Sequence, residues 1–301
     1  MKQGLGKEVL LVTTAEEDRW KDSIYAIGAG NGITRVKISA QYHEEFTQMR
    51  AHNDSLYGIY GRHVYDILND KEVAEIGGYR SPSLESLASH DGKLYCSDDG
   101  ICSDSFFGSS WSTAPSIYDA ETKKEVRCKR ALAMVSHKGK LYAGGLGWVY
   151  DVLTGKNIHT HKEWAKDPAG RGWDDPQFSM KFMPNWAGIE RIISLASHKE
   201  GLYFGCKRNS KGARGIYEAF TKEKVAERSE DVTALASYNG MLIDATGSAI
   251  YCTLKDEEGK KPVWEFNGQI KDIASIPAEV WNALVKKGRA ALKKGRIAQS
   301  V

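Results

Sequence analysis

Val135-Ser-His-Lys-Gly-Lys-Leu-Tyr142 is the stretch that decides the fold, because its pattern recurs along the chain. Four more segments align with it: Arg50-Ala-His-Asn-Asp-Ser-Leu-Tyr57, Ala88-Ser-His-Asp-Gly-Lys-Leu-Tyr95, Ala196-Ser-His-Lys-Glu-Gly-Leu-Tyr203 and Ala236-Ser-Tyr-Asn-Gly-Met-Leu-Ile243. A second block follows each copy: Val64-Tyr-Asp66, Ile117-Tyr-Asp119, Val149-Tyr-Asp151, Ile216-Tyr-Glu218 and Ile250-Tyr-Cys252. The chain is therefore built from internal repeats.

Each repeat predicts four short antiparallel strands. Apolar and β-branched runs alternate with Ser-His-x-Gly and Thr-x-Lys turns, and no helical period spans them. About 40 residues of this kind make one blade of a β-propeller. A degenerate N-terminal copy supplies the sixth unit, with 22–28 expected as its Leu-Tyr strand and 32–36 as the next. We predict an all-β propeller of six blades over residues 1–276. Because 270–276 resembles another first strand, seven blades is the alternative, unless that segment completes an existing blade or belongs to a tail outside the ring.

One repeat resembles a known kind of blade. Gly139-Lys-Leu-Tyr-Ala-Gly-Gly-Leu-Gly-Trp-Val-Tyr-Asp-Val-Leu-Thr-Gly-Lys156 is similar to the Gly-x-Leu-Tyr and Tyr-Asp-x-x-Thr-Gly strands of quinoprotein-type and related propellers. The resemblance recurs over roughly residues 8–268. The tryptophan that follows the Thr-Gly turn in that family is missing from most copies, so the resemblance implies no quinone, and we expect no cofactor. The Gly-His and Trp-Asp signature of WD repeats is also missing.

The composition indicates an ordinary soluble chain. Of 301 residues, 41% are hydrophobic and 27% charged, which suits a packed core. Five scattered cysteines favour a reducing compartment, with Cys96 and Cys102 as a weak metal or redox pair. No run of apolar residues is long enough for a signal sequence or membrane span, so we expect a cytoplasmic protein.

The recurring histidines are interpreted as scaffold. His52, His90, His137 and His198 occupy one repeat position, so symmetry spreads them round the ring. We expect each imidazole to hydrogen-bond turn backbone or a neighbouring blade. The repeated tyrosines and the Tyr-Asp aspartates are expected to be structural for the same reason.

Function is better sought where the repeat is interrupted. Two insertions, 96–116 and 159–190, lengthen the chain, and a four-stranded meander places both on one face of the disc. Aromatic residues gather in them, as on recognition surfaces, although they could equally pack the insertions onto the ring. The predicted ligand- or partner-binding residues are Phe106, Phe107, Trp111, Trp164, Arg171, Trp173 and Trp186.

Two weaker chemical signals lie in the longer insertion. His159, His161 and Glu163 alternate, so an extended strand would place three metal ligands on one side; a solvated polar strand edge is the default. Asp174 and Asp175 are weak catalytic candidates, because paired carboxylates can do acid–base work. No Walker loop, nucleophile elbow or zinc-protease helix occurs in the sequence.

The C-terminal segment 277–301 is a basic amphipathic helix or tail. Its basic residues are Lys286, Lys287, Arg289, Lys293, Lys294 and Arg296, and without their six charges the net +3 becomes −3. Such a tail can bind RNA, an acidic protein surface or anionic lipid, or it can be a solvated helix docked by Trp281.

Together these features favour a non-catalytic binding propeller. We expect it to engage a protein or ribonucleoprotein partner through the insertion face, with the tail as an electrostatic contact, to RNA in particular. The alternative is a propeller enzyme, a hydrolase or lyase acting on a saccharide or other small polar substrate at the channel mouth.

Overall fold

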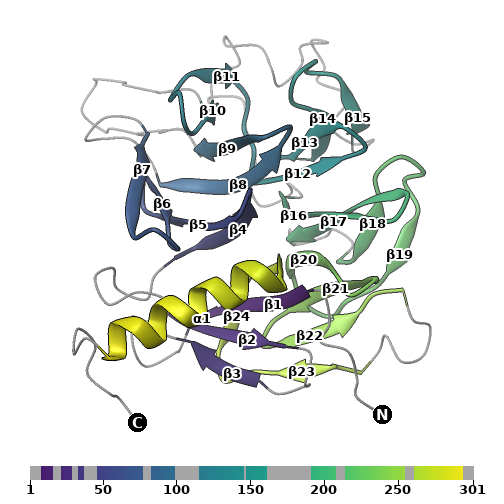
Figure 1. The fold of residues 1–301 in the computed structure, drawn as a ribbon. Helices are drawn as coiled ribbons and strands as arrows, with labels where there is room; N and C mark the ends of the chain where they lie inside the picture. The colour runs from purple at the N-terminus through teal and green to yellow at the C-terminus, as the bar shows by residue number, and fades with distance from the viewer. Residues whose placement is uncertain are drawn as a thin grey trace, which may run out of the picture.

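Six four-stranded antiparallel sheets surround one axis in the computed structural model (Figure 1). The structure describes residues 8–15, 22–28, 33–36, 46–76, 83–98, 115–145, 147–160, 191–207, 214–254 and 261–293. Each sheet is one blade, and blades 1 to 6 are numbered in the order in which their inner strands follow one another round the ring. The prediction of an all-β propeller with six blades is confirmed.

The strands share four positions, from the axis to the rim. The inner strands are β24 (Gln269–Pro277), β4 (Gln48–His52), β8 (Leu84–His90), β12 (Ala133–His137), β16 (Arg191–His198) and β20 (Val232–Tyr238). The second strands are β1 (Glu8–Ala15), β5 (Ser55–Tyr60), β9 (Lys93–Asp98), β13 (Lys140–Gly144), β17 (Gly201–Lys207) and β21 (Met241–Thr246). The third strands are β2 (Asp22–Ile27), β6 (His63–Asp66), β10 (Ile117–Asp119), β14 (Trp148–Asp151), β18 (Ile216–Glu218) and β22 (Ala249–Cys252). The outer strands are β3 (Ile33–Val36), β7 (Lys71–Glu75), β11 (Glu125–Arg127), β15 (Asn157–Thr160), β19 (Lys224–Ala226) and β23 (Trp264–Glu265).

The two ends of the chain close the ring in blade 1. Strand β24 pairs antiparallel with β1, from Glu8 against Pro277 to Ala15 against Gln269. The segment 270–276 therefore completes an existing blade, and the seven-blade alternative is wrong. Our strand assignment in the N-terminal copy is also wrong: Asp22–Ile27 is the third strand, because the C-terminal segment supplies the first and Glu8–Ala15 the second.

The hydrophobic core is divided among the blade interfaces. Six clusters of buried side chains each join two adjacent blades. At the interface of blades 4 and 5, for example, Tyr142 and Val149 pack with Leu195 and Phe204. Since each blade buries both of its faces, no single blade forms a core alone.

At one end of the axis, which we call the turn end, two-residue turns join inner and second strands. In blades 3, 4 and 6 both turn residues have positive φ, as in Lys138 (47°) and Gly139 (70°). Glycine is favoured at the second position, because type I′ turns need left-handed backbone there. The Tyr-Asp aspartates stabilise the next turn at this end: Asp151 accepts the backbone N–H groups of Leu153 and Thr154 at 3.1 Å.

The recurring histidines link adjacent blades at the turn end. Each imidazole Nδ1 lies 2.8 to 2.9 Å from the Oγ of a serine in the next blade. The four pairs are His52–Ser89, His90–Ser136, His137–Ser197 and His198–Ser237. The interpretation of these histidines as scaffold is confirmed.

Blade 1 interrupts this series on both sides. Its inner strand carries Ile276 at the histidine position, and blade 2 correspondingly carries Ala51 at the serine position, so this contact is apolar. On the other side, blade 6 has Tyr238, whose hydroxyl donates to the Ile27 carbonyl at 3.3 Å. The serine position of blade 1, Ser275, has a buried Oγ with no hydrogen-bond partner among the described residues.

Helix α1 (Ala278–Lys293) continues directly from β24 and lies across the turn end of blades 1 and 2 (Figure 1). Val280 is buried, and Trp281 and Leu284 pack on the same cluster, which includes Leu11 and Ile276. The Lys287 ammonium donates to the Leu68 carbonyl, in the turn between β6 and β7. The predicted helix is thus docked on the ring through its apolar side.

Candidate ligand-binding cavity

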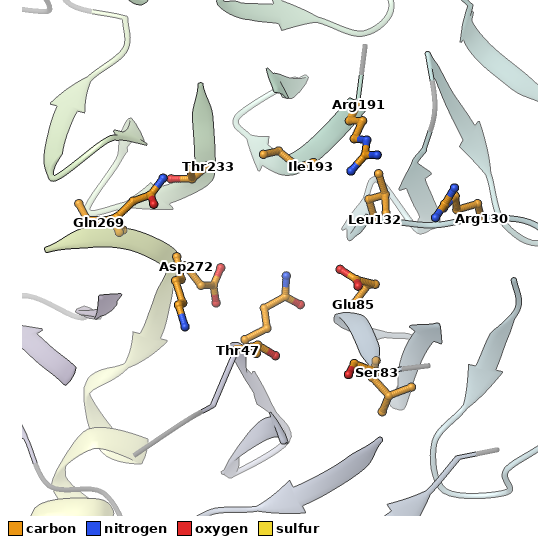
Figure 2. Close-up of a pocket in the computed structure, with 14 residues that line it drawn as sticks. Thr47, Ser83, Glu85, Arg130, Leu132, Arg191, Ile193, Thr233, Gln269 and Asp272 are labelled. Atoms are coloured by element: carbon orange, nitrogen blue, oxygen red, sulfur yellow. The ribbon is translucent and has the colours of Figure 1, made fainter. Parts of the chain in front are cut away.

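A cavity of about 410 Å³ lies on the axis at the opposite end from the turns, which we call the cavity end. Residues from the starts of all six inner strands line it (Figure 2). Polar and charged side chains predominate in the lining, including Thr47, Gln48, Ser83, Thr233 and Gln269. A polar axial cavity of this size is a site for a small molecule or for a projecting side chain.

One repeat position supplies an inner ring of lining residues. Counting back five residues from the histidine position reaches a lining residue in every blade: Lys271, Thr47, Glu85, Leu132, Ile193 and Thr233. In four blades this residue is skipped in the pairing with the second strand, as Glu85 is between the pairs Leu84–Asp98 and Ser86–Ser97. A β-bulge of this kind changes the direction of a side chain, so the bulges account for the recurrence of this position in the lining.

A second repeat position, seven residues before the histidine, places two arginines in the cavity. Arg130 belongs to blade 4 and Arg191 to the neighbouring blade 5. Arg191 is exposed, Arg130 is half-buried, and Figure 2 shows Arg191 extending from the start of β16 towards Leu132. Ser83 and Gln269 hold the same position in blades 3 and 1. Two of the three cationic residues of the lining therefore lie on adjacent blades.

Gly145 fixes the backbone at both arginines. Its carbonyl accepts the N–H of Ile192 at 2.9 Å, which ties blade 4 to the residue after Arg191. A Cβ at Gly145 would lie 2.8 Å from the Arg130 carbonyl oxygen and 2.7 Å from Trp148 Nε1. Tyr150 further donates its hydroxyl to the Arg130 carbonyl at 3.1 Å. Glycine is needed here because these backbones approach too closely for a side chain.

The carboxylate of Asp272 is already compensated within the protein. It accepts two hydrogen bonds from the Arg50 guanidinium, at 2.8 and 3.2 Å, and one from the Met49 N–H at 3.1 Å. Asp272 is only 4% exposed, so this pair crosslinks blades 1 and 2 at the cavity end. Of the remaining charged lining residues, Arg130, Arg191 and Lys271 are cationic and Glu85 is anionic. The cavity thus carries a net positive charge.

The strands on either side of the two insertions end at the cavity end. Strand β9 continues to Asp98, whose N–H donates to the Ser116 carbonyl at 3.0 Å, and β16 begins with the lining residue Arg191. The described residues that flank both insertions therefore lie at the cavity end of the ring, and one of them, Arg191, lines the cavity. The predicted residues within them lie outside the described part of the chain: Phe106, Phe107, Trp111, His161, Glu163, Trp164, Arg171, Trp173, Asp174, Asp175 and Trp186.

His159, the described member of the candidate metal set, is a buried residue of β15. It is 9% exposed, and its ring packs against Phe204 of blade 5 with centroids 4.7 Å apart. The alternative of a solvated strand edge is therefore wrong at this position. Within the described ranges, ligand atoms of His63, Glu72 and Glu75 also cluster within 4.8 Å, but Arg62 pairs with Glu75. That ion pair already neutralises one of the three groups.

The cysteines of the described ranges are free thiols: Cys96, Cys128, Cys206 and Cys252. Burial raises the pKa of the Cys96 thiol far above its ordinary value, so the group stays protonated and is a poor metal ligand or nucleophile. Its proposed partner Cys102 lies outside the described part.

The described part of the basic helix lies at the turn end, away from the cavity. Lys286 and Lys287 are exposed on α1. Arg289 and Lys293 belong to the last turns of the helix, but their side chains, like Lys294 and Arg296 as a whole, lie outside the described set. The helix is amphipathic, and within the described ranges no helix is long and apolar enough to cross a membrane.

Sequence reasoning missed the lining residues because their types vary between blades. Lys271, Glu85 and Ile193 have nothing in common except an offset of five residues from the histidine position. That constant offset was the available signal: aligned repeats show which variable positions point to the axis. The two arginines follow from the same alignment at an offset of seven.

The geometry defines a six-bladed propeller with a polar axial cavity. Comparisons with known proteins add little to this description. No protein-family profile matches the sequence, and no curated protein matches it. The computationally designed protein Ika8 is similar in structure, with a TM-score of 0.44 and 13% identity over 86% of this chain and 76% of its own. The designed Ika4 gives 0.35 and 14% over 60% and 98%, and the β-propeller domain of Cps50 (Swd1) from Myceliophteria thermophila gives 0.41 and 14% over 69% and 65%. At these values the similarities say nothing of ligand or partner.

Proposed function

We propose that the protein is a non-catalytic binding propeller that engages a protein or ribonucleoprotein partner through its cavity end. The observation that supports this most directly is the polar, positively charged axial cavity, which lies at the same end of the ring as the described residues that flank both insertions. Rigid strands that present variable residues and long loops at one end form a binding scaffold. The aromatic residues of the insertions would supply the contact area, with Trp111 and Trp173 as anchors.

A binding role fits the chemistry of the described lining better than a catalytic one. The lining there contains two carboxylates, of which Asp272 is held by Arg50 and Met49, and it contains no histidine or cysteine. A general base or nucleophile would need a group with a proton to exchange near a neutral pKa. The enzyme alternative would therefore depend on Glu85 in the lining or on Asp174 and Asp175 in the insertion.

The basic helix would provide a second, separate contact. Because α1 lies at the turn end, a partner on the cavity face reaches its lysines only by passing round the rim of the disc. We infer that the helix and tail bind an acidic segment or RNA belonging to the same assembly, through charge more than through shape.

Partner recovery with paired variants tests the cavity face. The full chain, its Trp111→Ala/Trp173→Ala variant and its Lys286→Gln/Lys287→Gln variant serve as bait in cell extract, with and without ribonuclease, at two salt concentrations. The expected result is a defined partner that the tryptophan variant loses and the lysine variant keeps at low salt. Equal recovery by all three baits, or turnover of a saccharide by the purified chain, would contradict the proposal.

An RNA titration tests the helix. A fluorescent single-stranded RNA is titrated with the full chain and with the variant Lys286→Gln/Lys293→Gln/Lys294→Gln/Arg296→Gln, which leaves the docked apolar side of α1 intact. The slope of log K against log salt should fall by up to about 3, since each lost phosphate contact removes about 0.7 for a single strand. The matched control replaces four exposed lysines elsewhere, Lys71, Lys124, Lys156 and Lys261. The same fall in both variants would show that the helix has no special part.

A further inference from the structure

The backbones of two cavity arginines on adjacent blades are both held by contacts with Gly145. The Gly145 carbonyl holds the N–H of Ile192, while the Gly145 backbone lies directly against the Arg130 carbonyl. Tyr150 adds a hydrogen bond to Arg130 from its own blade. Arg130 and Arg191 therefore start from backbone positions fixed relative to each other. Arginines whose backbones are fixed in this way lose less conformational freedom when they bind an oxyanion.

The charge of the cavity selects an anion over a cation. The Asp272 carboxylate is neutralised by Arg50, so it does not oppose an incoming negative group. Lys271 adds a third positive charge from blade 1, and Glu85 of blade 3 is the remaining negative one. Arginine also matches the planar geometry of carboxylates and the tetrahedral geometry of phosphates through paired N–H donors.

The rest of the lining suits a ligand body with hydroxyl groups. Thr47, Ser83 and Thr233 offer hydroxyls, and Gln269 offers an amide. The Gln48 amide oxygen accepts the Leu87 N–H at 2.6 Å, so the NH₂ group is the end of this side chain that can donate to a ligand. A volume of about 410 Å³ lies within the usual range for sites that hold small molecules.

We propose that the cavity binds a small polyhydroxylated molecule that carries a carboxylate or a phosphate, with Arg130 and Arg191 holding the oxyanion. The site goes beyond the proposed partner-binding function, because it needs no macromolecular partner. It uses the axial cavity itself, whereas the proposed partner face would consist of the insertions.

Calorimetry on the full chain tests the site with four probes: glucuronate, glucose 6-phosphate, glucose and inorganic phosphate. We expect at least one charged sugar to bind with a Kd below about 1 mM and glucose not to bind. The difference between glucuronate and glucose 6-phosphate shows which oxyanion is preferred. Inorganic phosphate should bind more weakly than the preferred charged sugar, because it lacks the ligand body.

Variants assign the binding to the arginines. Arg191→Gln should weaken the preferred charged sugar at least tenfold with an unchanged melting temperature, because this side chain is exposed. Lys156→Gln, which removes one exposed positive charge at the turn end, should bind as the parent does. The proposal is overturned if no anion binds at about 10 mM, if glucose binds as well as the charged sugars, or if both variants behave alike. Loss of sugar binding with the partner retained separates this site from the partner face.

Discussion

The two ends of each inner strand differ in how far their residue types recur from blade to blade. At the turn end, five of six blades carry histidine or tyrosine at one position, and four histidines bind the serine of the next blade. At the cavity end, the position five residues earlier is occupied by lysine, glutamate, leucine, isoleucine or threonine. The constant end holds the blades together, and the variable end is free to form a site. A repeat protein thus separates stability from recognition within a single strand.

Removing the closing strand should have the largest effect on this arrangement. A chain that stops after Gly268 lacks β24, which is the inner strand of blade 1. Two of the six interface clusters then lose the side chains that β24 contributes to them. We expect loss of cooperative thermal unfolding, measured by circular dichroism. A chain that stops after Pro277 keeps β24 and loses only the helix, so it should melt cooperatively at a lower temperature. Cooperative melting of the shorter chain would show that the ring does not need closure.

Breaking the cavity-end link between blades 1 and 2 should have the next largest effect. Asp272→Ala leaves the buried Met49 N–H and the Arg50 guanidinium without their acceptor. The expected loss in the free energy of unfolding is about 3 kcal/mol, measured by urea denaturation. Glu85→Ala, which removes an exposed carboxylate from the same cavity, should cost much less. Equal costs would mean that the cavity end has no specific role in joining these blades.

A fifth histidine–serine pair can be built where blade 1 interrupts the series. Ile276→His alone should cost about 2 kcal/mol, because it places an unpaired imidazole in an apolar cluster beside Ala51. Adding Ala51→Ser should recover about 1 kcal/mol through the new hydrogen bond. The coupling energy from the double-mutant cycle is the measurement. Strict additivity of the two changes would argue against the pairing rule.

Acid should weaken the turn end slightly. Burial, followed by the neighbouring Lys138 and Lys199 respectively, lowers the pKa of His137 and of His198 below the ordinary value. The unfolded chain binds these protons below a pH of about 6.5, whereas the folded chain takes them up only at lower pH. The contribution to stability is therefore complete above that pH and is lost as the pH falls through the lowered pKa values. Between pH 7 and 5, urea midpoints of His137→Gln/His198→Gln should fall less than those of the parent, and an equal fall would contradict this assignment.

The sequence allowed most of the fold to be predicted, but little of the cavity. Recurrence identified the blades and assigned His52, His90, His137 and His198 to the scaffold, since symmetric residues cannot converge on one site. It misassigned 22–28, because the pairing of β24 with β1 joins segments at opposite ends of the chain and shifts the strand order by one. Arg130 and Arg191 were missed because residue type does not show where a side chain lies. The contacts of Gly145 with the Arg130 carbonyl and with the N–H of Ile192 bring the two backbones close together.

The closure of blade 1 also governs how the protein is made. Strands β1, β2 and β3 leave the ribosome before the other strands of the ring, yet the inner strand of their own sheet is the last strand of the ring to be synthesised. More than two hundred residues separate Val36 from Gln269, so at ordinary rates of translation the first blade waits roughly 10 to 50 s for completion. During that time the edge of β1 that β24 will occupy is unpaired, and Leu10 lacks the partners in its cluster that come from β20 to β24. The newborn N-terminal strands are thus the part of the molecule that a chaperone would have most reason to hold.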